Sequence, residues 1–307
     1  MSTTSTCERI LDFSQHPAYL RADGALLSIE SADNPIATLP FAEIAAVLLS
    51  HPQTTITRGA LAGLAQAGAI VVTADESYLP ISMMLPLTGF HAPARRMAAQ
   101  LAAQLPTRKR LWQQVIHAKI SAQASLLEEE RGEDFGLRSL AAEVRSGDPD
   151  NCEGQAARIY WPSLFNDLNF TRRSDVPNQN RYLNYAYAIV RAVTTRAICA
   201  VGLHPGLGLH HHHRENPFCL ADDLMEPFRP AADRIALNVL RDFGPDAEME
   251  KKLKARLIDV TNQRFDIAGE QRTLFDALAK LALSVASVFE GRGDRATLPD
   301  FQSETRP

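Results

Sequence analysis

The sequence predicts an α+β protein in which a β-rich domain at residues 1–90 precedes a larger all-α domain at residues 91–307. Short apolar runs separated by turn residues fill the first part of the chain, which is typical of strands. From His91 onward, apolar residues recur at helical spacing instead. At 307 residues the chain is long enough to bury two cores.

The first 90 residues read as strands interrupted by one helix. Asp23-Gly24 is a hairpin-type turn signal, and Pro35 and Pro40 break the segment that follows it. Gly59–Ala67 has the apolar spacing of a short helix. Strands are expected at Ile10–Phe13, Ala18–Arg21, Ala25–Glu30, Ile44–Leu49 and Ala69–Thr73.

The remaining residues read as helices followed by a loose polar tail, Gly291–Pro307. Pro106 interrupts the first helical pattern, and Asn151 is placed to cap a helix that begins at Cys152. The other helices are expected at Ala94–Leu105, Leu111–Glu130, Tyr182–Val201, Ala231–Arg241, Ala247–Thr261 and Glu270–Phe289.

The segment Gly202–Pro230 carries the clearest chemical signal, because it gathers five histidines and four acidic residues. Imidazole and carboxylate groups are ligands for Mn, Fe and Zn, and carboxylates with water suit Mg. Asp223 and Glu226 are three residues apart, so on a helix they project from one face, and a preceding histidine completes a three-ligand site. The same composition also fits a metal-scavenging surface loop without catalysis.

Glu153 lies in the first turn of the helix that Asn151 caps. On spacing alone, its carboxylate is explained by the favourable interaction of a negative charge with the amino-terminal end of a helix.

Charge and cysteine usage restrict the partners and the compartment. The net charge of −4 and a pI near 6.1 provide no global positive field, so a nucleic-acid partner would need local basic patches. The four cysteines are scattered and fit reduced thiols. Because no apolar run of about 18 residues occurs, we expect a cytoplasmic protein that does not enter a membrane.

Four ordered sequence blocks resemble a known family. They are D-P-D-N-C-E-G-Q-A-A-R-I-Y-W at Asp148–Trp161, N-R-Y-L-N-Y-A-Y at Asn180–Tyr187, G-L-G-L-H-H at Gly206–His211 and F-C-L-A-D-D-L-M-E-P-F-R-P at Phe218–Pro230. Together they closely resemble the CRISPR-associated integrase and endonuclease of the spacer-adaptation module, in its type II version. The resemblance covers nearly the whole chain, since Pro80–Pro86 and Trp112–Ile120 also fit.

The resemblance implies a β-rich dimerisation domain followed by a helical catalytic domain with an Mg²⁺ or Mn²⁺ site. The family's metal-site positions fall on Glu153, His211 and Glu226, with Asp223 as an accessory carboxylate. Glu153 is then a ligand rather than only a partner of the helix dipole. His210, His212 and His213 surround the matched histidine, so the sequence leaves the ligating histidine open among them.

The resemblance also implies the reaction and the partners. The 3′-hydroxyl of a short double-stranded DNA fragment attacks a phosphodiester at the leader-repeat junction of the CRISPR array, which inserts the fragment as a spacer. Two homodimers sandwich a dimer of the small second adaptation protein, forming a heterohexamer. Candidate DNA contacts are Arg158, Arg172, Arg173 and Arg181.

Two alternatives have a different function. In the first, the chain is a DNA-binding scaffold with an inert metal site. In the second, it is a metal-dependent hydrolase of small phosphoesters. The first requires DNA processing to survive loss of Glu153, and the second requires a narrow pocket in place of an extended basic surface.

Overall fold

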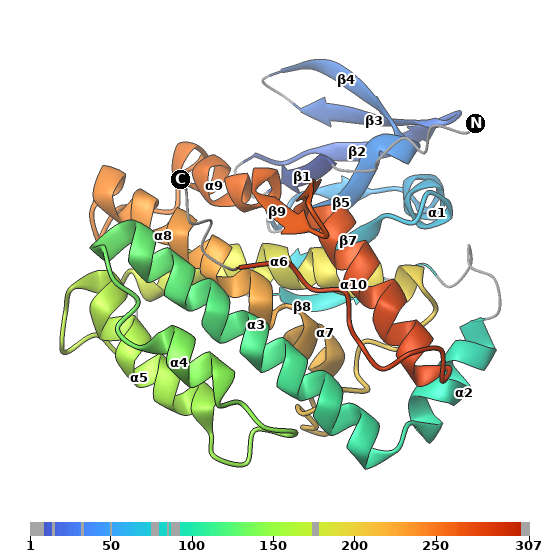
Figure 1. The fold of residues 1–307 in the computed structure, drawn as a ribbon. Helices are drawn as coiled ribbons and strands as arrows, with labels where there is room; N and C mark the ends of the chain where they lie inside the picture. Colours follow the sequence, from blue (N-terminus) through green and yellow to red (C-terminus); the bar gives the residue numbers. More distant parts are fainter. Residues whose placement is uncertain are drawn as a thin grey trace. The chain divides into compact units, whose positions relative to one another are not determined.

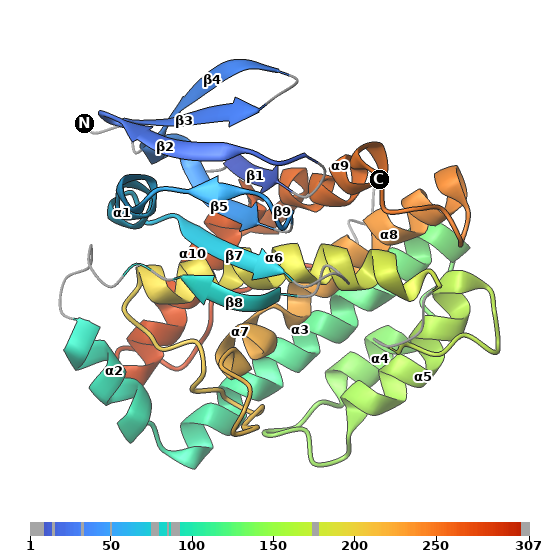
Figure 2. The same ribbon diagram turned by 180° about the vertical axis from the view of Figure 1, so that it is seen from behind.

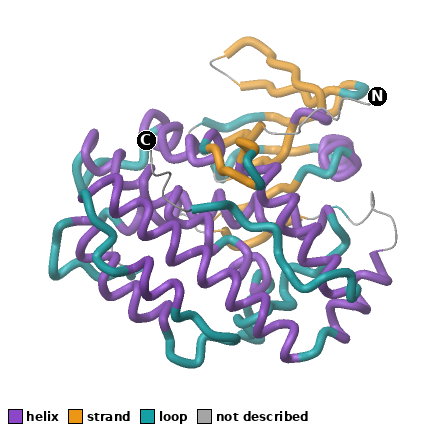
Figure 3. Tube along the Cα trace, viewed as in Figure 1, coloured by secondary structure: helices purple, strands orange, loops and turns teal. Residues whose placement is uncertain are grey.

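The structure is a computed structural model that describes residues 9–13, 16–31, 34–49, 51–74, 80–84, 86, 93–173 and 178–301. The chain forms two compact units, Met1–His91 and Ala92–Pro307, which are described separately. The first is rich in strands and the second in helices, which confirms the predicted fold class (Figure 1 and Figure 3). The dimerisation role of the first unit stays a prediction.

The described part of the amino-terminal unit contains two four-stranded sheets, the helix α1 (Arg58–Gln66) and the 3₁₀ turn η1 (Phe41–Glu43). The first sheet has the order β1-β5-β7-β8, in which β1, β5 and β7 are parallel and β8 is antiparallel. Its strands are β1 (Arg9–Phe13), β5 (Ile44–Leu49), β7 (Ile70–Ala74) and β8 (Pro80–Met84). The second sheet, ordered β4-β3-β2-β6, consists of β2 (Tyr19–Asp23), β3 (Leu26–Ser31), β4 (Asn34–Pro40) and β6 (Thr55–Ile56).

The prolines at 35 and 40 lie within β4, so the prediction that they break this segment is wrong. Among the described strands, β4 pairs with β3 alone and lies at the edge of its sheet. An edge strand tolerates proline because one of its sides has no hydrogen-bonding partner strand. The buried core of this unit contains Leu20, Leu27, Ile44, Val47 and Leu64.

The carboxy-terminal unit consists of helices around the long α3 (Leu105–Arg131). α4 (Leu137–Ala142) and α5 (Cys152–Phe165) pack beside α3, and α6 (Asn180–Ala200) packs against α8 (Arg229–Phe243) and α10 (Leu274–Phe289) (Figure 1 and Figure 2). The remaining elements include α2 (Pro93–Ala102), α7 (Cys219–Leu224), the 3₁₀ turns η2 (Glu226–Phe228) and η3 (Asp259–Asn262), and α9 (Lys251–Ile258). No described helix has the length and apolar character required to span a bilayer.

Two predicted helix boundaries in this unit are wrong. Pro106 lies in the first turn of α3, where a proline needs no hydrogen-bond donor, so it begins the helix instead of interrupting it. Glu270–Thr273 forms β10, which pairs with β9 (Arg264–Ile267), so α10 begins only at Leu274. The domain predicted as all-α therefore contains one hairpin.

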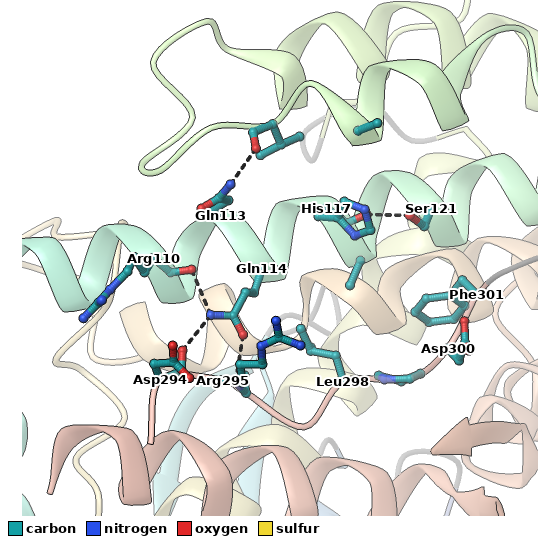
Figure 4. A pocket seen from close by; sticks show the side chains of 15 residues that line it. Arg110, Gln113, Gln114, His117, Ser121, Asp294, Arg295, Leu298, Asp300 and Phe301 are labelled. Carbon is teal, nitrogen blue, oxygen red and sulfur yellow. Dashed lines mark hydrogen bonds between the residues drawn. The ribbon is translucent and has the colours of Figure 1, made fainter. Parts of the chain in front are cut away.

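The predicted loose tail is ordered as far as Phe301, and the residues beyond lie outside the described part of the chain. Gln114 on α3 donates to the carbonyl of Asp294 at 3.0 Å and accepts from the amide of Ala296 at 2.8 Å. The Ser125 hydroxyl donates to the carbonyl of Phe301 at 2.8 Å. A groove of about 790 Å³ lies between α3, this tail and the end of α4. Figure 4 shows the side chains that line it.

Candidate metal centre

The central feature of the helical unit is a lysine that joins two carboxylates. Nζ of Lys119, on α3, lies 2.6 Å from Oε1 of Glu153 and 2.7 Å from Oε2 of Glu226. Glu153 comes from the first turn of α5 and Glu226 begins η2, so three elements meet here. Burial disfavours the lysine charge, but the attraction of Glu226 and Glu153 outweighs it and raises the pKa of Lys119.

The start of α5 positions Glu153. Asn151 adopts a left-handed conformation with φ of 52°, and its side chain accepts from the amide of Gly154 at 3.1 Å, which confirms the predicted cap. Asp148 accepts from the amides of Cys152 and Glu153 at 2.8 and 3.1 Å. A Cβ on residue 154 would lie 2.6 Å from Nδ2 of the Asn151 side chain, so this cap needs glycine at position 154. Because other groups cap the helix, the Glu153 carboxylate can face Lys119.

Glu226 is almost fully buried, with a side chain only 4% exposed. Nε of Arg229 lies 3.0 Å from its Oε1. Burial opposes ionisation, but the charges of Arg229 and Lys119 hold the pKa of Glu226 below its ordinary value. Its other oxygen, Oε2, lies 2.7 Å from the Lys119 ammonium. The arrangement therefore keeps Glu226 ionised, with a cationic side chain beside each of its oxygens.

His211 is oriented by Asp223, a residue of α7 with no exposed surface. Its Nδ1 lies 2.6 Å from Oδ1 of Asp223. The same carboxylate accepts from the amides of Leu209 at 2.5 Å, His210 at 3.1 Å and His211 at 3.2 Å. The hydrogen bond to Asp223 raises the pKa of His211, and partial burial opposes the shift. With Nδ1 committed to the carboxylate, Nε2 remains as the possible metal-binding atom.

Gly208 allows the histidine loop to approach Asp223. A Cβ at this position would overlap the carbonyl oxygen of His211 and lie 2.8 Å from Oδ2 of Asp223. The close approach of two backbone segments therefore excludes a side chain here.

The other histidines of the run have different surroundings. The His210 ring stacks on Trp112, with centroids 4.4 Å apart and planes 4° from parallel. Nδ1 of His212 lies 2.5 Å from the carbonyl oxygen of His210, and Nδ1 of His213 accepts from the amide of Glu215 at 3.3 Å. Of the four consecutive histidines at 210–213, His211 is the one whose Nδ1 contacts a buried carboxylate among the described residues. The structure favours it over its neighbours as a ligand.

Asp223 and Glu226 do not share one continuous α-helix, so that prediction is wrong. α7 ends at Leu224, and Glu226 begins a 3₁₀ turn. Asp223 contacts the histidine loop, whereas Glu226 contacts Lys119 and Arg229. Asp223 is thus placed behind His211, as a support for a ligand.

The full ligand set is not assembled around one point in the described residues. They contain no group of three histidine, cysteine, aspartate or glutamate side chains at metal-binding spacing. His211 and Glu226 are close enough to affect each other's ionisation, and Lys119 joins the two glutamates. This donor set fits a divalent cation, because carboxylate oxygens are good ligands for such ions and one oxygen of each glutamate already faces a single cation, the Lys119 ammonium.

Sequence reasoning missed Lys119 and Arg229. Lys119 follows Trp112 by seven residues and Ile116 by three, so the apolar helix face of these two side chains also carries a lysine. A lysine on a buried face signals an anionic partner, because an unpaired buried charge is strongly unfavourable. Arg229 follows Glu226 by three residues, which is the spacing of a helical ion pair.

The four candidate DNA-binding arginines differ in their surroundings. The side chain of Arg158 is exposed and has no ion pair or hydrogen bond with a described residue. Arg172 donates to Asn180 and Asn184 at 3.1 and 2.8 Å, and Arg181 donates to the carbonyl of Pro245 at 2.8 Å. Arg173 is exposed and has contacts of its own. Arg158 is therefore the candidate with the most accessible guanidinium.

Comparison with known proteins identifies the family. The family model described as "CRISPR associated protein Cas1" matches residues 13–258. This chain belongs to the Cas1 family. The CRISPR-associated endonuclease Cas1 of Neisseria meningitidis serogroup C (strain 8013) is 38% identical over 268 residues, covering 86% of this chain and 87% of the relative. A Cas1 of Pyrobaculum aerophilum is 25% identical over 283 residues, covering 88% and 95%.

Solved structures share the fold. A "Casposase bound to integration product" superposes with a TM-score of 0.77 at 19% identity, covering 97% of this chain and 94% of that chain. A "Cas6-RT-Cas1--Cas2 complex" gives a TM-score of 0.78 at 17% identity, covering 99% of this chain and 37% of the other. The region matched by the Cas1 family model includes Lys119, Glu153, His211 and Glu226.

Proposed function

We propose that this Cas1 chain is the integrase of CRISPR adaptation, a metal-dependent DNA endonuclease and transesterase that inserts short DNA fragments into the array. The observation that carries the proposal is the meeting of Glu153 and Glu226 at one cation, the Lys119 ammonium. Membership of the Cas1 family supports the same activity.

Glu153, His211 and Glu226 would hold Mg²⁺ or Mn²⁺, with Asp223 as the accessory carboxylate that orients His211. When bound, the ion would polarise a phosphoryl oxygen and offset the charge that develops on the leaving 3′-oxygen. Arg229 keeps Glu226 ionised, and Asp223 holds a proton on Nδ1 of His211 so that Nε2 carries the free electron pair. Attack by a DNA 3′-hydroxyl then forms one phosphodiester bond as another breaks.

The substrate is double-stranded DNA, as the spacer precursor and as the CRISPR repeat. Arg158, with Arg172, Arg173 and Arg181 as further candidates, would contact its phosphates. The chain would act in the cytoplasm as a homodimer, two copies of which hold a dimer of the small second adaptation protein. The fold shared with a Cas1 inside a Cas1–Cas2 complex supports such an assembly.

Strand transfer of a short labelled duplex into a supercoiled plasmid with the leader and repeat tests the proposal. The assay includes the partner protein and Mg²⁺ or Mn²⁺, and compares the chain with Glu153→Ala. Joining should require the metal and should disappear in the variant. Glu133→Ala, which changes an exposed glutamate outside the site, should join DNA normally.

Two results would favour the alternatives. If Glu153→Ala still joins DNA, the site assignment fails and the scaffold with an inert metal site gains support. If the chain cleaves a small phosphodiester as fast as DNA and joins none, the small-phosphoester hydrolase is favoured.

A further inference from the structure

We propose that Lys119 is a built-in counter-cation that holds Glu153 and Glu226 together in the metal-free protein and withdraws when a divalent ion binds. This inference rests on the proposed function, because it concerns the same metal site. It assigns a role to a residue that is not one of the predicted ligands.

Two carboxylates cannot both stay ionised at close range without a cation between them. Nζ of Lys119 lies 2.6 and 2.7 Å from one oxygen of each glutamate. Arg229 pairs with the other oxygen of Glu226 and has no described contact with Glu153. Among the described contacts, the lysine is thus the cation that joins the two glutamates.

A divalent ion and the ammonium cannot share this position. Carboxylate oxygens bind Mg²⁺ at about 2.1 Å, so an ion bridging the same two oxygens would lie nearly where Nζ lies. The charges of the two cations would also repel strongly in a site this poorly exposed to water. Metal binding must therefore displace the ammonium.

The lysine can make this movement. Its ammonium ends a flexible stem of four carbons and carries a single compact charge, so it can leave both carboxylates at once. The side chain is 13% exposed, so the protein does not enclose it completely. A bidentate arginine at this position would be more rigidly held to its partners.

Calorimetric titration of the full-length chain with Mn²⁺ tests this role. Lys119→Met removes the competing charge and keeps most of the side-chain volume, so Mn²⁺ should bind at least about tenfold more tightly than to the unchanged chain. The rise in melting temperature on adding Mn²⁺ should also be larger in the variant. Lys109→Met, at an exposed position of the same helix, should match the unchanged chain. Equal or weaker Mn²⁺ binding by Lys119→Met would overturn the inference.

Mn²⁺ titration of a Glu153→Gln variant separates the proposed metal site from the proposed displacement of Lys119. If the unchanged chain binds Mn²⁺ through Glu153 but Lys119→Met binds no tighter, only the displacement role fails. If the unchanged chain shows no Mn²⁺ binding that depends on Glu153, the metal site and the role of Lys119 both fail.

A crystal structure of the unchanged chain with Mn²⁺ decides the matter if Lys119→Met does not fold. The distances from Nζ to both carboxylates should then exceed about 4 Å, the limit of an ion pair. An ammonium still within hydrogen-bond distance of both glutamates beside the bound ion would overturn the inference.

Discussion

Nδ1 of His211 lies 2.6 Å from Oδ1 of Asp223, and the same carboxylate also accepts hydrogen bonds from three backbone N–H groups of the histidine loop. Asp223 therefore ties the loop to α7 and sets the ring orientation of the histidine at the same time. Orientation of a ligating histidine by a buried carboxylate is a common way to fix its tautomer.

Asp223→Asn should destabilise the metal-free protein. The asparagine side chain has one oxygen acceptor and an NH₂ group, whereas the backbone of the histidine loop offers only N–H donors here. At least one buried backbone N–H therefore loses its acceptor. We expect the free energy of unfolding to fall by about 3 kcal/mol. Urea denaturation in a chelator measures it, with the exposed Asp246→Asn as the unchanged control. A stability equal to that of the control would contradict the role of Asp223.

The same substitution should shift the pH dependence of Mn²⁺ binding. Asp223 raises the pKa of His211, and only the neutral ring can bind a metal. Metal affinity is then lost as the pH falls through this raised pKa. Asp223→Asn lowers the pKa, so its loss of affinity should occur at a more acidic pH. Titrations from pH 8 to 5 compare the two, and coincident profiles would exclude this linkage.

Substitution of the histidines one at a time should distinguish the ligand from its neighbours. His211→Gln should reduce strand transfer and Mn²⁺ affinity by at least about tenfold, because it removes Nε2. His212→Gln should leave both unchanged, since His212 is exposed and contacts only the carbonyl of His210 among the described residues. The reverse order of effects would place the ligand at His212.

Asp233 should make the protein's stability depend on pH. Burial raises the pKa of Asp233 to about 6, although the hydroxyls of Tyr187 and Tyr160 donate to it and oppose the shift. Because the folded-state pKa is raised, the stability from this group is present below its unfolded pKa and is lost as the pH rises through about 6.

Asp233→Asn removes this titration. The unfolding free energy of the unchanged chain, minus that of the variant, should therefore decrease by about 2 kcal/mol between pH 4 and pH 8. Urea denaturation at several pH values measures the difference. A constant difference across this range would show that Asp233 titrates normally.

Arg158 and Arg181 should respond differently when replaced by alanine. Arg158→Ala should weaken DNA binding and lower the slope of log affinity against log salt by about 1, because one phosphate contact is lost. Arg181→Ala should instead cost about 1 kcal/mol of stability, since it removes the hydrogen bond to Pro245. Fluorescence anisotropy over a salt series and urea denaturation separate the two. An unchanged salt slope for Arg158→Ala would remove it from the DNA surface.

The sequence alone determined the order of the two units and most of their elements. Periodicity is a local property, so strands such as Ile44–Leu49 and helices such as the one capped by Asn151 could be predicted from neighbouring residues. Two of the errors occurred where longer-range context decides. Pro35 and Pro40 are tolerated because β4 is an edge strand, and Glu270–Thr273 is a strand because Arg264–Ile267 pairs with it.

The resemblance of short sequence blocks to the family identified the candidate residues Glu153, His211 and Glu226. Only the tertiary structure decided what surrounds them. Lys119 lies 34 residues before Glu153 and meets both glutamates because α3, α5 and η2 converge, which no local pattern reveals. Likewise, Asp223 binds His211 because the chain folds back on itself after Gly208. Electrostatic partners are chosen by distance in space, and that distance exists only after folding.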